Sequence, residues 1–90
     1  MAKRGKLEII RDILAIIQTH HNSIKPTPLL RQSNLSSSRF KEYFSELIEK
    51  GFISEHIRSK SAKLISLTDK GQRFLENYKT IINFIDEFEL

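Results

Sequence analysis

The sequence predicts a mainly α-helical domain with one small β-hairpin, an α+β fold in which three helices precede two strands and a long last helix. Apolar residues recur at helical spacing through most of the chain, the spacing changes to about two after Gly51, and a polar, basic run divides the two apolar segments that follow. A chain of 90 residues has room for one hydrophobic core. It contains no cysteine, so neither a disulfide nor a thiolate zinc site can supplement that core.

The first two helices are predicted from an apolar stripe and from residues that end helices. The stripe runs from residue 6 to about residue 20 and consists of Leu7, Ile10, Ile13, Leu14 and Ile17. Asn22 and the prolines that follow it end this helix. We expect a short second helix with Thr27 as its N-cap and Pro28 at its first position. It should stop near Asn34, a residue that tolerates a left-handed turn.

A third helix is predicted to begin at Ser36 or Ser37, which are both good N-caps, and to run to Lys50. Gly51 stands where a glycine commonly ends a helix. The apolar face of this helix consists of Phe40, Tyr43, Phe44, Leu47 and Ile48.

The hairpin and the last helix complete the predicted fold. Apolar residues at 52, 53 and 57 and at 64, 65 and 67 predict two short strands. The run from Arg58 to Lys63 lies between them and should form a cationic tip. Thr68 and Asp69 are expected to cap a final helix that reaches about Glu89.

Two short helices joined by a tight turn and followed by a basic hairpin are the plan of a winged helix-turn-helix. The third helix of such a domain can lie in the major groove of DNA, while the hairpin reaches flanking phosphates or the minor groove. We therefore expect the groove surface to comprise Ser37, Ser38, Arg39, Lys41 and Ser45. The hairpin contacts would be Arg58, Lys60 and Lys63, with an auxiliary phosphate-binding arm of Lys3, Arg4 and Lys6.

Each of these features also has a plainer explanation. The serines at the start of the third helix can be caps alone, and a basic hairpin can be a solvated turn that protects an edge strand from aggregation. Glu42 is expected on the same face as Lys41, where its carboxylate repels phosphate unless it accepts a hydrogen bond from a cytosine amino group.

The chain resembles small archaeal winged-helix DNA-binding proteins over about Leu7 to Ile85. The resemblance lies in residues 26–36, in an aromatic set within the third helix, and in two later segments that contain glycine. These are Pro26–Ser36, then Phe40, Tyr43 and Phe44, then Leu47–Ile53, and last Leu67–Gly71. The resemblance implies DNA binding. Members include transcriptional regulators and a chromatin-type subgroup that dimerises through an antiparallel coiled coil of the last helix.

The last helix carries an apolar pattern of its own. Five of its large residues are spaced 4, 3, 4 and 3 positions apart, which is the heptad pattern of a coiled coil. They are Phe74, Tyr78, Ile81, Ile85 and Phe88. A 90-residue domain already has its first helix to fill the core, so we expect this surplus to bury against a second copy. The predicted dimerisation residues are Phe74, Tyr78, Ile81, Ile82, Ile85 and Phe88.

Charge is divided unevenly along the chain. Residues 1–63 contain twelve Lys or Arg and six Asp or Glu, a net charge of +6, whereas residues 64–90 carry a net charge of −2. We therefore expect a DNA-binding domain at 1–68 and a dimerisation helix at 69–90. Basic residues at the start of that helix and acidic residues near its end favour antiparallel pairing of two copies.

Other chemistries find little support in the sequence. His20 and His21 diverge by about 100° on a helix and do not chelate a metal together. No catalytic constellation, glycine-rich phosphate loop or apolar run of membrane-spanning length is present. We expect an intracellular, nucleoid-associated protein without enzymatic activity, cofactor, metal or small-molecule ligand.

The predicted function is transcriptional regulation by a homodimer bound to double-stranded DNA. Two alternatives stay open: a nonspecific architectural protein of chromatin, which a low specificity ratio would reveal, and a winged-helix module that binds another protein.

Overall fold

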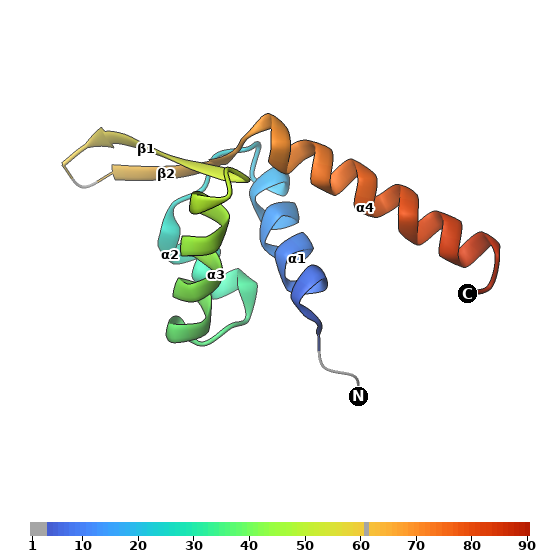
Figure 1. Cartoon of the computed structure of the whole chain (residues 1–90). Helices are drawn as coiled ribbons and strands as arrows, with labels where there is room; N and C mark the ends of the chain where they lie inside the picture. Colours follow the sequence, from blue (N-terminus) through green and yellow to red (C-terminus); the bar gives the residue numbers. More distant parts are fainter. Residues whose placement is uncertain (1–3, 61) are drawn as a thin grey trace.

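The computed structural model describes residues 4–60 and 62–90 and contains the predicted elements in the predicted order (Figure 1). They are α1 (Lys6–Thr19), α2 (Pro26–Ser33), α3 (Ser37–Glu49), β1 (Ile53–Ser59), β2 (Ala62–Leu67) and α4 (Asp69–Glu87). The mainly helical fold with one antiparallel hairpin is therefore confirmed. Lys3, one of the three residues predicted to form an arm, lies outside the described residues.

The core is built around α1, which packs against α2, α4 and β2. Its stripe is buried largely as predicted and consists of Ile9, Ile10, Ile13, Leu14 and Ile17. Leu7 was assigned to this stripe wrongly, because its side chain is 60% exposed. It lies in the first turn of α1, ahead of Ile9, the first buried residue of the described chain.

The start of α2 also differs from the prediction. Lys25 is the N-cap and Pro26 is the first helical residue, so Thr27 lies inside the helix. Pro26 suits this position because its fixed φ is helical and its missing N–H would have had no partner there. Asn34 ends the helix in the left-handed conformation that the sequence predicted, with φ 61° and ψ 31°.

Both ends of α3 follow the capping pattern. Ser36 is the N-cap, and its hydroxyl accepts a hydrogen bond from the backbone N–H of Arg39 at 3.3 Å. Gly51 has a φ of 78°, a conformation that glycine adopts readily, so the chain can leave α3 and enter β1. Phe40 and Leu47 are buried, which fixes the rotation of the helix about its axis.

The hairpin is anchored in the core only at its base. Ile53 pairs with Leu67 there, and Ile65 also forms a backbone bridge to Ile24, which ties the hairpin to the loop before α2. Pairing continues to Ser59 and Ala62, with a register shift after Ile57. Arg58 therefore lies within β1, and the tip is shorter than predicted, because cross-strand pairing continues beyond it.

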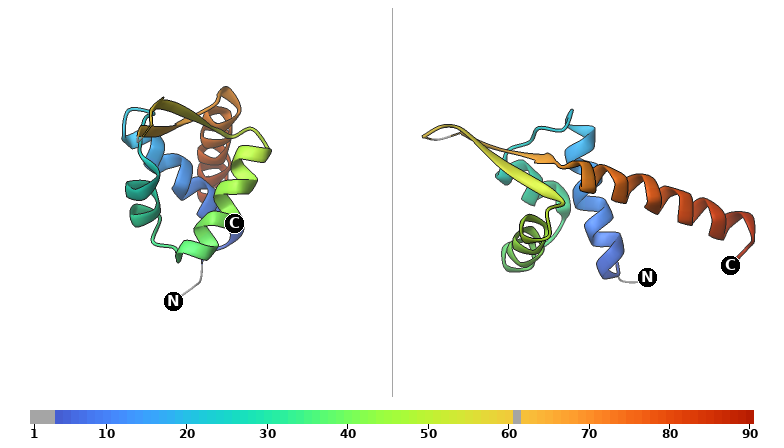
Figure 2. Two further views of the ribbon diagram at one scale, coloured as in Figure 1. Left: turned by 90° about the vertical axis from the view of Figure 1, so that its left-hand side faces the viewer. Right: turned by 45° about the horizontal axis from the view of Figure 1, so that its top comes forward.

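The last helix begins in the core and leaves it. Thr68 caps α4 by accepting a hydrogen bond from the N–H of Gly71 at 3.2 Å. Phe74 then packs edge-on against Phe52, with ring centroids 5.6 Å apart. The C-terminal half of the helix extends away from the other elements (Figures 1 and 2), and the helix ends at Glu87, two residues before the predicted end. Within residues 4–60 and 62–90, no helix combines the length and apolarity needed to cross a membrane.

Candidate nucleic-acid interface

The face of α3 opposite the core carries the residues predicted to enter a DNA groove. Phe40 and Leu47 turn the apolar side of the helix inward. The opposite side is exposed and comprises Ser37, Ser38, Arg39, Lys41 and Ser45. Across the part of the chain that the structure describes, no carboxylate lies within ion-pair distance of Arg39 or Lys41. This surface therefore offers hydroxyl groups and two uncompensated cations. Glu42 is exposed on α3 as well, as predicted.

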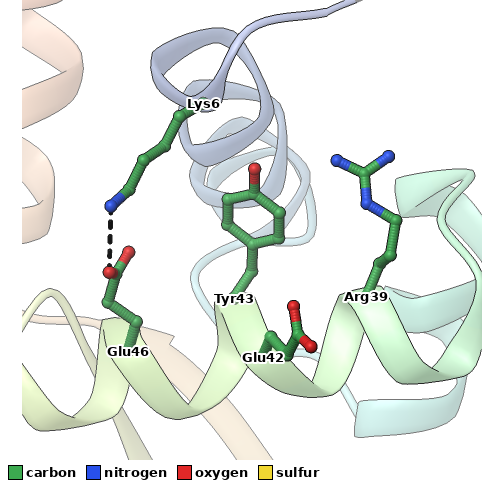
Figure 3. A pocket seen from close by; sticks show the side chains of 5 residues that line it. All are labelled: Lys6, Arg39, Glu42, Tyr43 and Glu46. Carbon is green, nitrogen blue, oxygen red and sulfur yellow. Dashed lines mark hydrogen bonds and ion pairs between the residues drawn. The ribbon is translucent and has the colours of Figure 1, made fainter.

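A hollow of about 230 Å³ lies beside this face, between α3 and the start of α1. It is lined by Lys6, Arg39, Glu42, Tyr43 and Glu46. In Figure 3 the ring of Tyr43 stands between Arg39 on one side and the ion pair of Lys6 with Glu46 on the other. The sequence assigned Tyr43 to the core alone. Its half-buried ring also lines the hollow beside Arg39.

Glu46 is held by cations from two helices. Its carboxylate accepts a hydrogen bond from Lys6 Nζ at 3.0 Å, and Lys50 Nζ lies 3.6 Å away. The hydrogen bond from Lys6, with a smaller contribution from the charge of Lys50, lowers the pKa of Glu46 below its ordinary value of 4.5. The negative charge of Glu46 is therefore compensated within the domain by Lys6 and Lys50.

The hairpin carries its cations away from the core. Arg58, Lys60 and Lys63 are all exposed. Lys63 Nζ forms an ion pair with Glu55 at 2.8 Å, so part of its charge is compensated. Arg58 and Lys60 form no ion pair with any residue in the described ranges. Figure 2 (left) looks toward the end of the hairpin, which lies across the top of the domain with α2 and α3 beneath it.

The described members of the predicted N-terminal arm are engaged within the domain. Arg4 pairs with Asp12 at 2.8 Å and donates a hydrogen bond to the backbone carbonyl of Ser33 at 3.0 Å, which joins α1 to the end of α2. Lys6 pairs with Glu46. The structure thus uses both side chains as ties between helices, and these ties were not predicted from the sequence.

The hairpin also has features that the sequence reasoning missed. Ile57 was counted as an apolar strand residue, yet it is 78% exposed because its strand position pairs with Lys63, beyond the core. On the other face of the hairpin, His56 Nε2 lies 2.8 Å from the hydroxyl of Ser66 and 3.1 Å from that of Ser54. Alternation along the strands was the signal that could have placed these side chains.

The six residues predicted for dimerisation divide into two groups. Phe74 and Tyr78 pack on the domain itself, where Tyr78 lies under the guanidinium of Arg11 at 5.6 Å from the ring centroid. Ile81, Ile82 and Phe88 are 57%, 39% and 58% exposed, and Ile85 is half-buried.

No group of three or more potential metal ligands comes together within the described residues.

Solved structures share this architecture. The DNA-binding protein Sso10a-2 from Sulfolobus solfataricus has 19% identity and a TM-score of 0.75, with 96% of this chain and 86% of that chain covered. F-93 of SSV1 has 23% identity and a TM-score of 0.66, with 97% of both chains covered. The transcriptional regulator PcaV from Streptomyces coelicolor has 18% identity and a TM-score of 0.73, covering 89% of this chain and 60% of that one. At these identities the likeness shows a common fold.

Sequence comparison adds the family. No protein of curated function is significantly similar in sequence to this chain. A family model of winged helix-turn-helix domains, however, matches residues 3–86, which include every helix and strand apart from the final residue of α4. The match indicates a DNA-binding domain that is not an enzyme. On this evidence and on its fold, the chain belongs to the winged helix-turn-helix family.

Proposed function

We propose that this protein binds double-stranded DNA as a homodimer and regulates transcription. The N-terminal part of α3 enters the major groove, and the hairpin contacts the flanking backbone. The observation that carries this proposal is the exposed, cation-bearing face of α3 together with a hairpin whose Arg58 and Lys60 have no ion-pair partner in the described chain. Sso10a-2, described as DNA-binding, and PcaV, described as a transcriptional regulator, share the fold and support the same role.

The dimensions and chemistry of α3 suit a major groove about 12 Å wide, which admits one helix. Arg39 and Lys41 supply charge for phosphates or for guanine acceptors, and Ser37, Ser38 and Ser45 supply small hydroxyls that can approach base edges. Residues 1–68 form the DNA-binding part of the chain in this proposal.

Residues 69–90 form the dimerisation element. The exposed apolar side chains of Ile81, Ile82 and Phe88 favour pairing with a second α4. Antiparallel pairing sets Lys70 and Arg73 against the acidic end of the partner helix. The 19 residues of α4 span about 28 Å, which is close to the spacing of about 34 Å between successive major grooves.

The proposal is tested by titrating labelled genomic and random duplexes at several salt concentrations while the mass of the protein is measured in solution. We expect binding with a steep salt dependence and a preference for some sequences, and we expect Ser38→Ala or Lys41→Ala to alter that preference. Equal affinity for every duplex would favour an architectural role. Absence of binding at about 50–100 mM salt would favour a protein-interaction module.

A further inference from the structure

An open groove of about 410 Å³ lies between α1 and α4, where the two helices diverge (Figure 1). It is lined by Arg11, Ala15 and Gln18 of α1 and by Leu75, Tyr78 and Ile82 of α4. We propose that the C-terminal tip of a second copy's α4 docks in this groove. The inference rests on the proposed homodimer and extends it, because it makes α1 part of the interface as well as α4.

The groove has both apolar and cationic character. Leu75 and Tyr78 are half-buried against the domain, while Ile82 is 39% exposed at the end of the groove. Arg11 lies over the ring of Tyr78, and its Nε is buried without a hydrogen-bond partner in the described chain. Its Nη2 pairs with Asp12 at 3.0 Å. Lys79 adds a second cation to the lining. Such a groove suits an occupant that is apolar and acidic.

The end of α4 has that chemistry. Phe84, Phe88 and Leu90 are 54%, 58% and 80% exposed, and the rings of the first two lie in contact at 4.8 Å between centroids, tilted by 44°. Three acidic side chains are interspersed with them, namely Asp86, Glu87 and Glu89. The tip therefore offers large apolar side chains to the groove and negative charge to Arg11 and Lys79.

Geometry assigns the tip to a second copy. Within one chain, α4 is a continuous helix that carries residues 84–90 away from α1 (Figure 1). A second α4 that runs antiparallel to the first brings its end back toward Leu75 and Gln18. The two-fold symmetry of such a pair fills both grooves at once, so the contact is closed and stops at a dimer.

The absence of native cysteine makes crosslinking a direct test. The doubly substituted chain Gln18→Cys/Phe88→Cys is oxidised under mild conditions and its mass is measured on a denaturing gel. Both side chains are exposed, so neither change should prevent folding. We expect a covalent dimer in high yield. The matched control is Glu42→Cys/Phe88→Cys, in which Glu42 is an exposed residue of α3, and it should stay largely monomeric on the gel.

Charge reversal provides a second measurement. Lys79→Glu and Glu87→Lys should each weaken the dimer a few-fold, and the two changes together should restore it. Lys60→Glu makes the same charge change on the hairpin and should leave dimerisation unaltered. A dimer in solution without the Gln18–Phe88 crosslink would overturn the docking while leaving the proposed homodimer intact. A monomer at all concentrations would overturn both.

Discussion

Two parts of the molecule leave the same core in opposite directions, the hairpin on one side and α4 on the other (Figure 1). Both are rooted in buried or half-buried apolar side chains, Ile53 and Leu67 for the hairpin and Phe74 for α4. Beyond their roots they differ. The hairpin presents cations and pairs its backbone within itself, whereas α4 presents isoleucine, phenylalanine and carboxylates. The comparison teaches that the side chains of an element beyond the core indicate the kind of partner it suits: cations suit a polyanion, and a row of apolar side chains suits another apolar surface.

One matched pair of residues makes the comparison sharp. Ile57 on the hairpin and Ile81 on α4 are the same residue type and are 78% and 57% exposed. Ile57 stands opposite Lys63 among cations, while Ile81 belongs to a face that also includes Phe84 and Phe88. An isolated exposed isoleucine is ordinary, whereas a contiguous apolar face calls for a partner.

The largest effect is expected for Ile81→Asp. A carboxylate in the centre of the proposed dimer interface would be desolvated without a partner, so the dissociation constant of the proposed dimer should rise at least about 100-fold, or about 2.7 kcal/mol. Sedimentation across a concentration series measures this change. Ile57→Asp is the control and should leave the mass unchanged. If Ile57→Asp dissociated the dimer and Ile81→Asp did not, the roles assigned to the two projections would be reversed.

The next largest effect is expected in the buried first turn of α4, at Gly71. A Cβ added to Gly71 would collide with the backbone carbonyl oxygen of Phe52, an atom that already accepts a hydrogen bond from the N–H of Thr68. Gly71→Ala should therefore lower the free energy of unfolding by about 1–3 kcal/mol in a urea titration. Gly5→Ala has open space around its Cβ and should change stability by less than about 0.5 kcal/mol. Equal stability of the two variants would show that the start of α4 approaches the backbone of Phe52 less closely than described.

A smaller effect, on DNA binding, is expected for Lys60→Ala combined with Lys63→Ala. Loss of the two proposed phosphate contacts should weaken binding about 10-fold at moderate salt and reduce the slope of log affinity against log salt by about 2. The effect should be similar for all sequences, because phosphates carry no base identity. Lys60 should contribute more than Lys63, whose charge is shared with Glu55. An unchanged salt slope in the hairpin variant would remove the hairpin from the DNA contact.

Local sequence signals were sufficient for the order of the elements and for most of their boundaries, although the start of α2 was predicted wrongly. Ser36, Asn34 and Gly51 mark boundaries through backbone geometry that neighbouring residues determine. The spacing of apolar residues also predicted which face of α3 points outward, because Phe40 and Leu47 lie on one side of a single helix.

Partners distant in sequence were not predictable in the same way. Arg4 meets Ser33 across 29 residues and Lys6 meets Glu46 across 40, so their engagement depends on how three helices pack. The heptad pattern of α4 likewise does not reveal that Phe74 is used internally, because that depends on where Phe52 lies. The packing of Gly71 against Phe52 likewise depends on contacts between residues that are distant in sequence.

The smallest effect is expected between the two projections, where Glu46 joins α3 to α1. The hydrogen bond from Lys6 lowers the pKa of Glu46 in the folded state below 4.5, so folding favours the ionised carboxylate. This stabilisation is present above the unfolded-state pKa and disappears as the pH falls through the lower folded-state pKa.

Glu46→Gln should therefore slightly reduce stability to urea at pH 7, with the difference from the parent chain shrinking as the pH drops below about 4.5. It should also shrink in 1 M salt, because the carboxylate is 29% exposed and the pair is screened. Glu49→Gln, at an exposed position of α3 that forms no ion pair within the described residues, should show a smaller difference at pH 7. A Glu46→Gln difference that grew on acidification would mean that the carboxylate is destabilising, and the tie between α1 and α3 would have to come from Arg4 and the apolar core alone.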